Sequence, residues 1–564
     1  MDFFSNPLHC LENFLDVLAT MFKLVVWVSL CGLWQLVYGM PSAIPEGTVR
    51  PHSSSVTSHP CSASSIPNPE LFGAEITSLS AREAHNYSID AGASSTFQAQ
   101  NYAGLEFCQV NITYTHSGTN DSIHVQVWLP LSGWNQRFMG TGGGGYATGA
   151  FDLALAPAIN RGYAAASTDG GHVLSVTTAR SWALASPGNV NQYLLLDFAS
   201  KSLHDMAVLG KAVTESFYGK APIYSYWDGC STGGRQGLME AQRYPNDYNG
   251  ILAAAPAINW PKFLPSEIWP QVVMNEEHVY PEQCEFDAIT AEAVKACDSI
   301  DGVKDGIIAA TGLCHFDPHS LVGQPFTCNT DGTKRMYSNA AATIVQETWG
   351  GPHKNSTRLW YGLNPGTSLS GLAFTNRTVA GTSYGVPFPI SDDWIQLFVK
   401  KDPSFNTTSI TASDFASIFH QSYQEYESIM GTDDPDLSAF RNAGGKMITW
   451  HGLADQLIFP NGTVDYYQRV MAVDPKVQDY YRLFLAPGVG HCGGGIGPTP
   501  DDQLGALIDW VEHGIAPSML STTSPPVDGT QTHRPLCVYP LVARWDGIGD
   551  STKGSSYKCS ASYT

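Results

Sequence analysis

Charged side chains are scarce in this chain. They make up 14% of its 564 residues, and Asp and Glu outnumber Lys and Arg by 51 to 30. The net charge of −21 repels nucleic-acid phosphates and anionic lipid, and no Lys/Arg cluster forms a local exception. C-x-x-C and H-E-x-x-H motifs and an internal repeat period are missing too, so a typical zinc motif and a repeat architecture have no support. With 43% hydrophobic residues, the composition favours a compact enzyme.

A hydrophobic run long enough to span a bilayer comfortably is also absent. The apolar segment Leu24–Tyr38 is short and ends in small and turn residues, which predicts a signal peptide within residues 1–43. A start at Met21 would place Lys23 directly before the apolar core, as in ordinary signals, so Met1 and Met21 both stay open as the start. An N-terminal membrane anchor is the alternative interpretation.

The cysteines and glycosylation motifs agree with export. Ten cysteines remain after the leader, and an even set in a secreted protein indicates disulfides. Seven N-x-Ser/Thr sequons can accept N-glycans where they lie on the surface: Asn86, Asn111, Asn120, Asn355, Asn376, Asn406 and Asn461. We therefore expect a secreted, extracellular glycoprotein that binds neither nucleic acid nor membranes. The oligomeric state stays open.

Strand-like and helix-like segments alternate in two parts of the chain, which predicts a mainly parallel sheet wrapped by helices. Short strands are expected at 108–115, 124–130, 137–140 and 162–169, before a long helix over 194–217. From residue 258 to 444 the alternation stops, and Trp, Pro and Cys punctuate the segment instead. We expect a fold of class α/β with a first core part at 44–257, an inserted lid domain at 258–444 and a second core part at 445–564.

A nucleophile motif lies between a predicted strand and a predicted helix. Gly229-Cys-Ser231-Thr-Gly233 fits G-x-S-x-G, in which the glycines permit a tight turn that exposes the serine hydroxyl. An ordinary glycine-rich turn is the alternative. In folds of this kind an acid and then a histidine follow the serine along the chain. Asp455 and His491 each follow a predicted strand in that order, which predicts a Ser231–Asp455–His491 triad.

Other residues compete for these roles. The rivals in the triad are His451, Asp465 and Asp228, although a histidine at the end of a strand, like His451, more often makes a structural hydrogen bond. An oxyanion hole needs two backbone N–H groups. The sequence predicts one from Thr232 and the other from the glycine run 142–145, through Gly143 or Gly144; a flexible hairpin is the alternative for this run.

Two cysteines flank the predicted triad. Cys230 precedes Ser231, and Cys492 follows His491. If the serine and the histidine are within hydrogen-bond reach, their neighbours are within disulfide reach, with Cα atoms about 5.5 Å apart. This coincidence links the two motifs independently of the catalytic argument.

Cys230-Ser231, Asp455 and His491-Cys492 together resemble the CS-D-HC signature of the tannase and feruloyl esterase family of fungal secreted serine esterases. The likeness extends over nearly the whole mature chain. It implies an α/β-hydrolase core with a lid, the triad named above and a Cys230–Cys492 bridge. Thr232 stands where tannases usually have Glu, so the chain is more similar to the feruloyl esterase B type.

The lid holds a second signal, an acidic and glycine-containing segment at residues 297–307. Acids at short intervals with sharp turns can wrap oxygen ligands around a hard cation, whereas a solvated acidic turn is the alternative. The resemblance implies a structural Ca²⁺ site with the ligands Asp298, Asp301, Val303, Asp305 and Ile307, the valine and isoleucine binding through their carbonyls. It also implies the disulfides Cys61–Cys108, Cys297–Cys314 and Cys537–Cys559, which leaves Cys284 with Cys328.

The predicted function is hydrolysis of an aromatic carboxylic ester. The resemblance implies a hydroxycinnamate such as ferulate on plant cell-wall polysaccharide, including xylan, with Trp260, Phe263 and Trp269 as candidates for an aromatic-lined pocket. Tannase activity on galloyl esters and an esterase of fungal secondary metabolism acting on small aromatic esters are the alternatives. A non-catalytic, calcium-stabilised carbohydrate-binding protein would predict a missing triad member, and all three are present. A serine peptidase is chemically possible, but the resemblance argues against it.

Overall fold

The fold is built on one nine-stranded mixed sheet, seen in a computed structural model that describes residues 58–91, 100–527 and 529–563. The predicted signal peptide lies outside the described residues. The strand order is β1-β2-β3-β5-β4-β8-β9-β16-β17. The strands are β1 (Ala74–Ala91), β2 (Gln100–His116), β3 (Ile123–Pro130), β4 (Arg137–Thr141), β5 (Ala164–Thr168), β8 (Tyr224–Cys230), β9 (Gly250–Ala254), β16 (Lys446–Gly452) and β17 (Tyr481–Ala486).

Strand direction divides the sheet into two parts. β1, β2, β3 and β5 pair antiparallel, and β5, β4, β8, β9, β16 and β17 pair parallel. Register places Gly250 of β9 beside Tyr226 of β8, and Met447 of β16 beside Tyr481 of β17. The carboxyl ends of the parallel strands therefore meet at one edge, where the loops of an α/β protein carry its site.

Helices cover both faces of this sheet, because its strands are apolar on both sides. Trp227 and Ile251 belong to the same buried cluster as the residues of α3, α4 and α12, whereas Tyr226 and Leu252, one position away in each strand, belong to the cluster of α1 and α13. These helices are α1 (Asp152–Asn160), α3 (Ser202–Tyr218), α4 (Thr232–Arg243), α12 (Pro460–Val473) and α13 (Gln503–His513). The predicted α/β class is confirmed.

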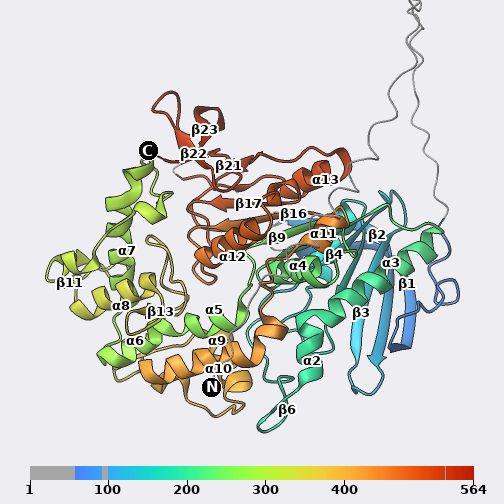
Figure 1. Ribbon diagram of the computed structural model, residues 1–564, viewed down its shortest axis with the longest axis horizontal. Helices are drawn as coiled ribbons and strands as arrows, with labels where there is room; N and C mark the ends of the chain where they lie inside the picture. Colours follow the sequence, from blue (N-terminus) through green and yellow to red (C-terminus); the bar gives the residue numbers. More distant parts are fainter. Residues whose placement is uncertain (1–57, 92–99, 528, 564) are drawn as a thin grey trace, which may run out of the picture. The chain divides into compact units, whose positions relative to one another are not determined.

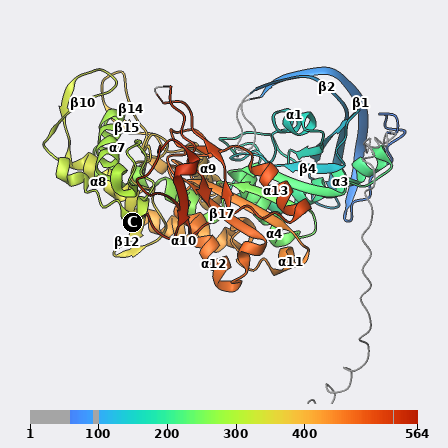
Figure 2. The same ribbon diagram turned by 90° about the horizontal axis from the view of Figure 1, so that it is seen from above.

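The segment between β9 and β16 is mainly helical and has its own core. Its aromatic centre includes Trp260, Trp394, Phe398 and Phe415. Figures 1 and 2 show α7 and α8 of this segment to one side of the sheet. The helical elements are α5 (Trp260–Glu267), α6 (Trp269–Glu277), α7 (Gln283–Cys297), η2 (Asp298–Asp301), η3 (Thr311–Leu313), η4 (Pro318–Leu321), α8 (Asn339–Gly350), α9 (Pro389–Asp393), η5 (Trp394–Val399), η6 (Thr407–Ser409), α10 (Ala412–Met430) and α11 (Ser438–Asn442).

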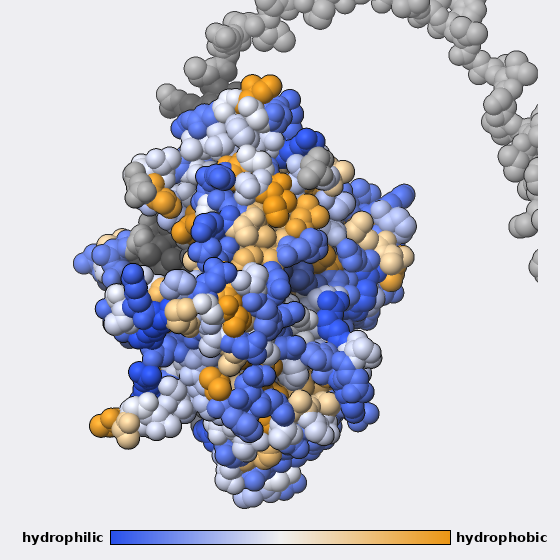
Figure 3. Space-filling model, turned by 90° about the vertical axis from the view of Figure 1, so that its left-hand side faces the viewer, coloured by the Kyte–Doolittle hydropathy of each residue, from blue (hydrophilic) through white to orange (hydrophobic). Residues whose placement is uncertain are grey.

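The insertion is joined to the sheet domain by packing at both of its ends. Its core also takes in Trp182 and Phe198, which precede β8 in the chain. Conversely, Phe440 of α11, inside the segment expected to be lid, packs in the sheet-domain core with Met447. Figure 3 views the side on which α7 and α8 lie, where hydrophilic residues predominate around a strip of hydrophobic ones. The segment thus packs against the sheet domain while keeping a largely polar outer surface.

The remaining short elements are mostly two-stranded ribbons. They are β6 (Leu184–Ser186) with β7 (Asn189–Val190), β10 (Pro325–Thr327) with β11 (Lys334–Met336), β12 (His353–Lys354) with β13 (Thr357–Arg358), β14 (Thr375–Arg377) with β15 (Ser383–Gly385), β18 (Thr499–Pro500) with β20 (Thr522–Thr523), β19 (Met519–Leu520) with β21 (Leu536–Cys537), β22 (Val542–Trp545) with β23 (Tyr557–Ser560), and the turns η7 (Val477–Asp479) and η8 (Gly554–Ser556).

The helix expected over 194–217 is divided into three pieces. α2 (Gln192–Leu196) passes into the π-helical turn η1 (Asp197–Lys201), which continues as α3. The apolar spacing of the sequence is continuous, but the π turn adds a residue to the local period, a change that hydrophobic spacing does not report.

Five disulfides cross-link the described residues. They join Cys61 to Cys108, Cys230 to Cys492, Cys284 to Cys328, Cys297 to Cys314 and Cys537 to Cys559. These are the pairs expected from the sequence and the resemblance. Within the part of the chain that the structure describes, no helix is both long and hydrophobic enough to cross a bilayer.

Candidate active site

The residues singled out for catalysis come together at the carboxyl edge of the parallel strands. β8 ends at Cys230, immediately before Ser231, while Asp455 and His491 lie in the loops after β16 and β17. The glycine run 142–145 follows β4, the strand that pairs with β8. Neighbouring parallel strands therefore bring four distant segments of the chain to one place.

Ser231 occupies a strained turn between β8 and α4. Its φ of 62° and ψ of −123° lie outside the regions that most L-residues adopt. A Cβ at Gly229 would come within 2.5 Å of the Gly233 backbone, and one at Gly233 within 3.1 Å of the Gly143 carbonyl oxygen. Close packing therefore requires glycine at 229 and leaves little room for a side chain at 233, as in a nucleophile elbow.

Asp455 is fully buried and bonded to the histidine. Its Oδ2 atom lies 2.8 Å from Nδ1 of His491, and its Oδ1 accepts hydrogen bonds from the backbone N–H groups of Leu457 and Ile458. Burial alone raises the pKa of Asp455, but the charges and hydrogen bonds of His491 and His451 outweigh it and hold the pKa far below its usual range. Asp455 is thus a permanent anion that orients His491.

The rival residues have other partners. His451 is buried with Nε2 3.0 Å from Asp455 Oδ2 and Nδ1 2.9 Å from Thr463 Oγ1, which is the structural role that its place at a strand end suggests. Asp465 accepts hydrogen bonds from Tyr361 and Arg469. Asp228 lies within β8, where its carbonyl oxygen accepts from Gly142 N.

Ser231 and His491 line one pocket. Among the described residues their side chains form no direct hydrogen bond, an arrangement common in enzymes without substrate. The adjoining cysteines are joined, with a Cα–Cα distance of 5.9 Å between Cys230 and Cys492. The disulfide ties the turn that holds the serine to the loop that holds the histidine.

Two of the backbone N–H groups expected to bind an oxyanion have other acceptors in the structure. Gly143 N donates to Gln236 Oε1, and Gly144 N donates to the Ala147 carbonyl oxygen, each at 3.1 Å, so neither of these two N–H groups is available. Gly145 instead lines the pocket beside Ser231 and Thr232, and the structure gives its N–H no acceptor among the described residues. A Cβ at Gly145 would lie 1.9 Å from the Val176 carbonyl oxygen. Thr232 and Gly145 both line the pocket beside Ser231 and are therefore the candidate oxyanion donors.

The pocket wall is mainly apolar and comes largely from the insertion. Trp260, Phe263 and Leu264 of α5 line it together with Phe388 and Ile390, and Leu457 and Ile458 close it from the sheet domain. Trp269, the third expected aromatic, is not part of this lining and packs against His353 and Phe415 instead. The wall suits a flat apolar group.

Glu267 is a buried carboxyl group in this apolar wall, at the end of α5. Its side chain lines the pocket, and its Oε2 atom has no hydrogen-bond partner. Burial raises the pKa of Glu267 well above its usual value, and the nearby charge of Asp455 adds to the shift. Both effects favour the neutral, protonated form of Glu267. The sequence signal for Glu267 is an acidic residue in the mainly apolar and aromatic segment 260–269.

The pH dependence of the unfolding free energy of a Glu267→Gln variant tests whether the Glu267 carboxyl group is protonated in the folded chain. An acid whose pKa is raised by folding contributes stability that is complete below its unfolded pKa, near 4.3, and is lost as pH rises toward the folded value, at about 1.4 kcal/mol per pH unit. Glutamine does not titrate, so the variant should gain stability over the native chain between pH 4.5 and pH 7. Denaturant unfolding at both pH values measures this gain.

The matched control is Glu277→Gln, because Glu277 is exposed. Its stability should follow that of the native chain at both pH values. A Glu267→Gln difference that does not change with pH would contradict a protonated Glu267.

The acidic loop of the lid places the expected ligands in unequal environments. Asp298 Oδ1 accepts from the N–H groups of Asp305 and Gly306, and Asp301 Oδ2 forms a buried ion pair with Arg534 at 2.7 Å. Asp305 Oδ2 is buried without a partner. Among the described residues, the three acidic or histidine side chains whose ligand atoms lie within 4.8 Å of one another are His116, Asp121 and Asp197, which lie outside this loop.

Comparisons with known proteins agree on one family. The family model described as tannase and feruloyl esterase matches residues 108–560. A protein of Arthroderma benhamiae named probable feruloyl esterase is 44% identical over 515 residues, which cover 90% of this chain and 94% of that protein. The solved structure of a tannin acyl hydrolase from Aspergillus niger has a TM-score of 0.80 at 28% identity and covers 89% of this chain and 95% of that one. Feruloyl esterase B from Aspergillus oryzae has a TM-score of 0.72 at 27% identity, with 87% and 97% covered.

Proposed function

This chain belongs to the tannase and feruloyl esterase family of α/β hydrolases and is a carboxylic ester hydrolase, and we propose that its substrates are hydroxycinnamic esters of plant cell-wall polysaccharide. The observation that carries the proposal is the buried Asp455–His491 pair, which opens into the same apolar pocket as Ser231.

The proposed mechanism is acyl transfer through Ser231. The hydroxyl oxygen attacks the ester carbonyl while His491 takes its proton and then gives it to the leaving alcohol. Asp455 holds the histidine in one tautomer and stabilises its positive charge. The N–H groups of Thr232 and Gly145 receive the oxyanion, and water activated by His491 then hydrolyses the acyl-enzyme.

The pocket wall supports a hydroxycinnamoyl group over a galloyl group. Ferulate has one phenolic hydroxyl and a methoxy group, whereas gallate has three hydroxyls that would each need a polar partner once buried. Trp260 and Phe263 offer flat apolar contacts, and Glu267 is the one carboxyl group of the lining. Tannase activity and hydrolysis of small aromatic metabolite esters are the alternatives.

Release of free acid from methyl ferulate and methyl gallate, measured in parallel, tests the substrate class. Ferulate should be released preferentially, and Ser231→Ala should abolish the release. A preference for gallate would assign tannase activity, and hydrolysis of neither ester would favour the metabolite esterase.

We also propose a structural Ca²⁺ in the lid loop. Carboxylate and carbonyl oxygens suit a hard cation, and the unpartnered buried Oδ2 of Asp305 supports this choice. Asp298, Asp301 and Asp305 would bind through carboxylates, and Val303 and Ile307 through carbonyls. The Arg534 pair already holds one oxygen of Asp301, so that residue would contribute less.

Calcium addition after chelator treatment should raise the melting temperature, because an ion at 100 times its Kd stabilises the native state by about 2.7 kcal/mol. Asp305→Asn should remove this response, and Asp501→Asn, at an exposed position, should retain it. Equal responses in both variants would place the bound calcium elsewhere.

Secretion is proposed from features that fit an oxidising compartment. Five disulfides are typical of exported proteins, and fungal relatives share the family. The sequon asparagines Asn86, Asn120, Asn355, Asn376, Asn406 and Asn461 are exposed. Asn111 is half-buried in β2, so it is the poorest acceptor of the seven.

A further inference from the structure

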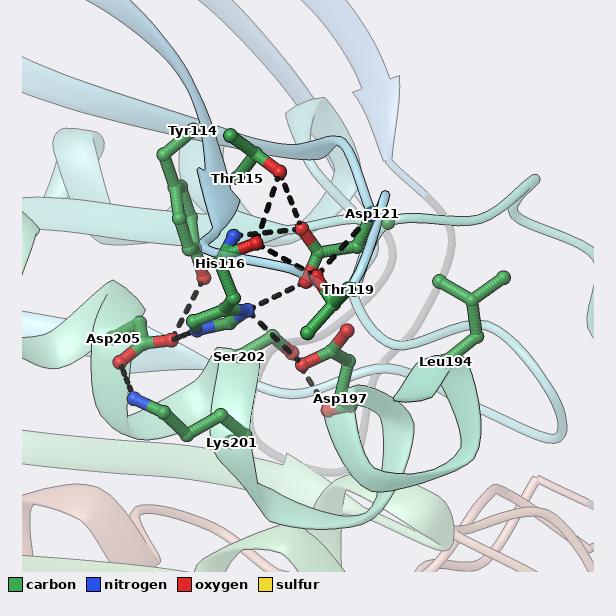
Figure 4. Close-up of polar contacts among 12 residues, drawn as sticks. Tyr114, Thr115, His116, Thr119, Asp121, Leu194, Asp197, Lys201, Ser202 and Asp205 are labelled. Atoms are coloured by element: carbon green, nitrogen blue, oxygen red, sulfur yellow. Dashed lines mark hydrogen bonds and ion pairs between the residues drawn. The ribbon is translucent and has the colours of Figure 1, made fainter. Parts of the chain in front are cut away.

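A second polar cluster lies outside the lining of the catalytic pocket. It joins His116 at the end of β2, Asp121 in the turn before β3 and Asp197 at the start of η1 (Figure 4). These residues are up to 81 positions apart in the chain (Asp197 against His116), so no short sequence motif marks them.

The three side chains converge on a common point. Nδ1 of His116 lies 2.6 Å from Oδ2 of Asp121 and 3.8 Å from Oδ1 of Asp197, and the three ligand atoms all lie within 4.8 Å of one another. Asp121 is held in this orientation because its other oxygen accepts hydrogen bonds from the backbone N–H of His116 and from Thr115 Oγ1. One nitrogen and two carboxylates thus face one small volume.

Asp197 is the member of the cluster without a sufficient partner. Its residue is only 3% exposed, and its Oδ2 atom is buried with no hydrogen-bond partner. Figure 4 shows the carboxylate turned toward the His116 ring. A buried carboxylate left in this state costs free energy, which a bound cation would offset.

The other side of the imidazole is oriented as in many metal sites. Nε2 of His116 lies 2.9 Å from Oδ2 of Asp205, in α3. Asp205 is in turn fixed by the Lys201 ammonium and by a 3.2 Å hydrogen bond from Tyr114 OH. A metal-binding histidine commonly donates its second ring N–H to a carboxylate, which fixes the tautomer and leaves the first nitrogen free to bind.

The charges of the cluster point to a divalent ion. When they are ionised, Asp121, Asp197 and Asp205 bring three negative charges, and Lys201 brings one positive charge. With a neutral imidazole, the surplus is two negative charges in a largely buried space. One divalent cation would neutralise it.

We propose that His116 Nδ1, Asp121 and Asp197 bind a divalent transition-metal ion, with Zn²⁺ as the ion that fits best. The nitrogen ligand favours Zn²⁺ over Ca²⁺ and Mg²⁺, which prefer all-oxygen shells, and a water completes a tetrahedron. Binding requires a deprotonated Nδ1, so any proton held there is released to solvent.

The ion would fasten the β2–β3 turn to the π-helical turn η1. The π-helical turn η1 also contacts α4, the helix that begins directly after Ser231. The carbonyl oxygens of Phe198 and Ala199 in η1 accept hydrogen bonds from the Arg235 guanidinium of α4. The site is therefore structural and supports the packing of η1 against α4, away from the reacting atoms.

The competing explanation needs no metal. A doubly protonated His116 could donate one N–H to Asp121 and the other to Asp205, and a proton would then take the place of the ion. Zinc binding by the chain itself separates the two explanations.

The test uses the full, tag-free chain, treated with chelator and then saturated with Ca²⁺ to fill the lid loop. Calorimetric titration with Zn²⁺ near pH 7 should give one site per chain, Co²⁺ should give the visible spectrum of a tetrahedral site, and Zn²⁺ should raise the melting temperature. Asp197→Asn should weaken binding by at least about 100-fold, and Asp205→Asn, which removes the carboxylate that orients His116, by about 10–100-fold.

Asp501→Asn is the matched control and should bind Zn²⁺ like the native chain, because Asp501 is exposed and lies outside the cluster. A far-ultraviolet circular dichroism spectrum and a cooperative melting transition report whether each variant has folded. Should Asp197→Asn not fold, the Asp205→Asn titration and the Co²⁺ spectrum of the native chain carry the test. Native chain that binds no stoichiometric Zn²⁺, or Asp197→Asn that binds it equally well, would overturn the proposal in favour of the protonated imidazole.

Discussion

Ser231→Ala is expected to lower kcat for ester hydrolysis by about 10⁴-fold or more, with little change in stability. In the proposed mechanism the Ser231 hydroxyl is the attacking group. No other hydroxyl of the pocket lining shares its place at the elbow, since Thr232 Oγ1 donates to the Gly145 carbonyl oxygen. Alanine keeps a side chain of similar size at the same strained φ, so the turn should persist. Initial rates on methyl ferulate, together with a melting curve, measure both effects.

The control for this variant is Ser413→Ala, at an exposed position of α10. Its rate should equal that of the native chain. The oxyanion donors remain in Ser231→Ala, so a residual rate of about 10³–10⁴ over the uncatalysed reaction is compatible with the mechanism. A rate within tenfold of native would refute Ser231 as the nucleophile.

The second large effect is expected from Cys230→Ala combined with Cys492→Ala. This disulfide closes the longest loop of the five, with a sequence separation of 262, so its loss should destabilise the chain by about 3–5 kcal/mol. It also joins the residue before Ser231 to the residue after His491. A displacement of about 1 Å between these catalytic groups costs about 10²-fold in rate, so kcat should fall together with stability.

Cys537→Ala with Cys559→Ala separates the two effects. That disulfide closes a separation of 22 and lies outside the catalytic pocket lining, so its loss should lower stability by about 3 kcal/mol and leave kcat unchanged at temperatures where the variant is folded. Equal kcat values for the two double variants would mean that the Cys230–Cys492 bridge does not position the triad.

Local motifs were predictable from the sequence because few residues determine them. The turn at Ser231 depends on Gly229 and Gly233, which lie within five positions, and its strand–turn–helix setting follows from the adjoining pattern. The places of Asp455 and His491 followed from their positions after strands, since parallel strands meet at one edge. The Cys230–Cys492 pair followed from the same proximity.

Features that depend on distant partners were not predictable in this way. The sequence does not distinguish Gly143, Gly144 and Gly145 as oxyanion donors. In the structure Gln236 and Ala147 accept hydrogen bonds from Gly143 N and Gly144 N. Trp269 and Phe263 both look like pocket aromatics, but only the packing of α5 and α6 decides which of them reaches the pocket.

The sequence by itself determined the α/β class, the residues of the candidate triad and the disulfide next to them, because each rests on local periodicity or on short spacing around one residue. Tertiary structure alone decided which glycine of the run lines the pocket, the burial of the Glu267 carboxyl group and the proximity of His116, Asp121 and Asp197. Burial and hydrogen-bond availability are properties of the packed chain, since each depends on which distant atoms exclude water or accept the bond.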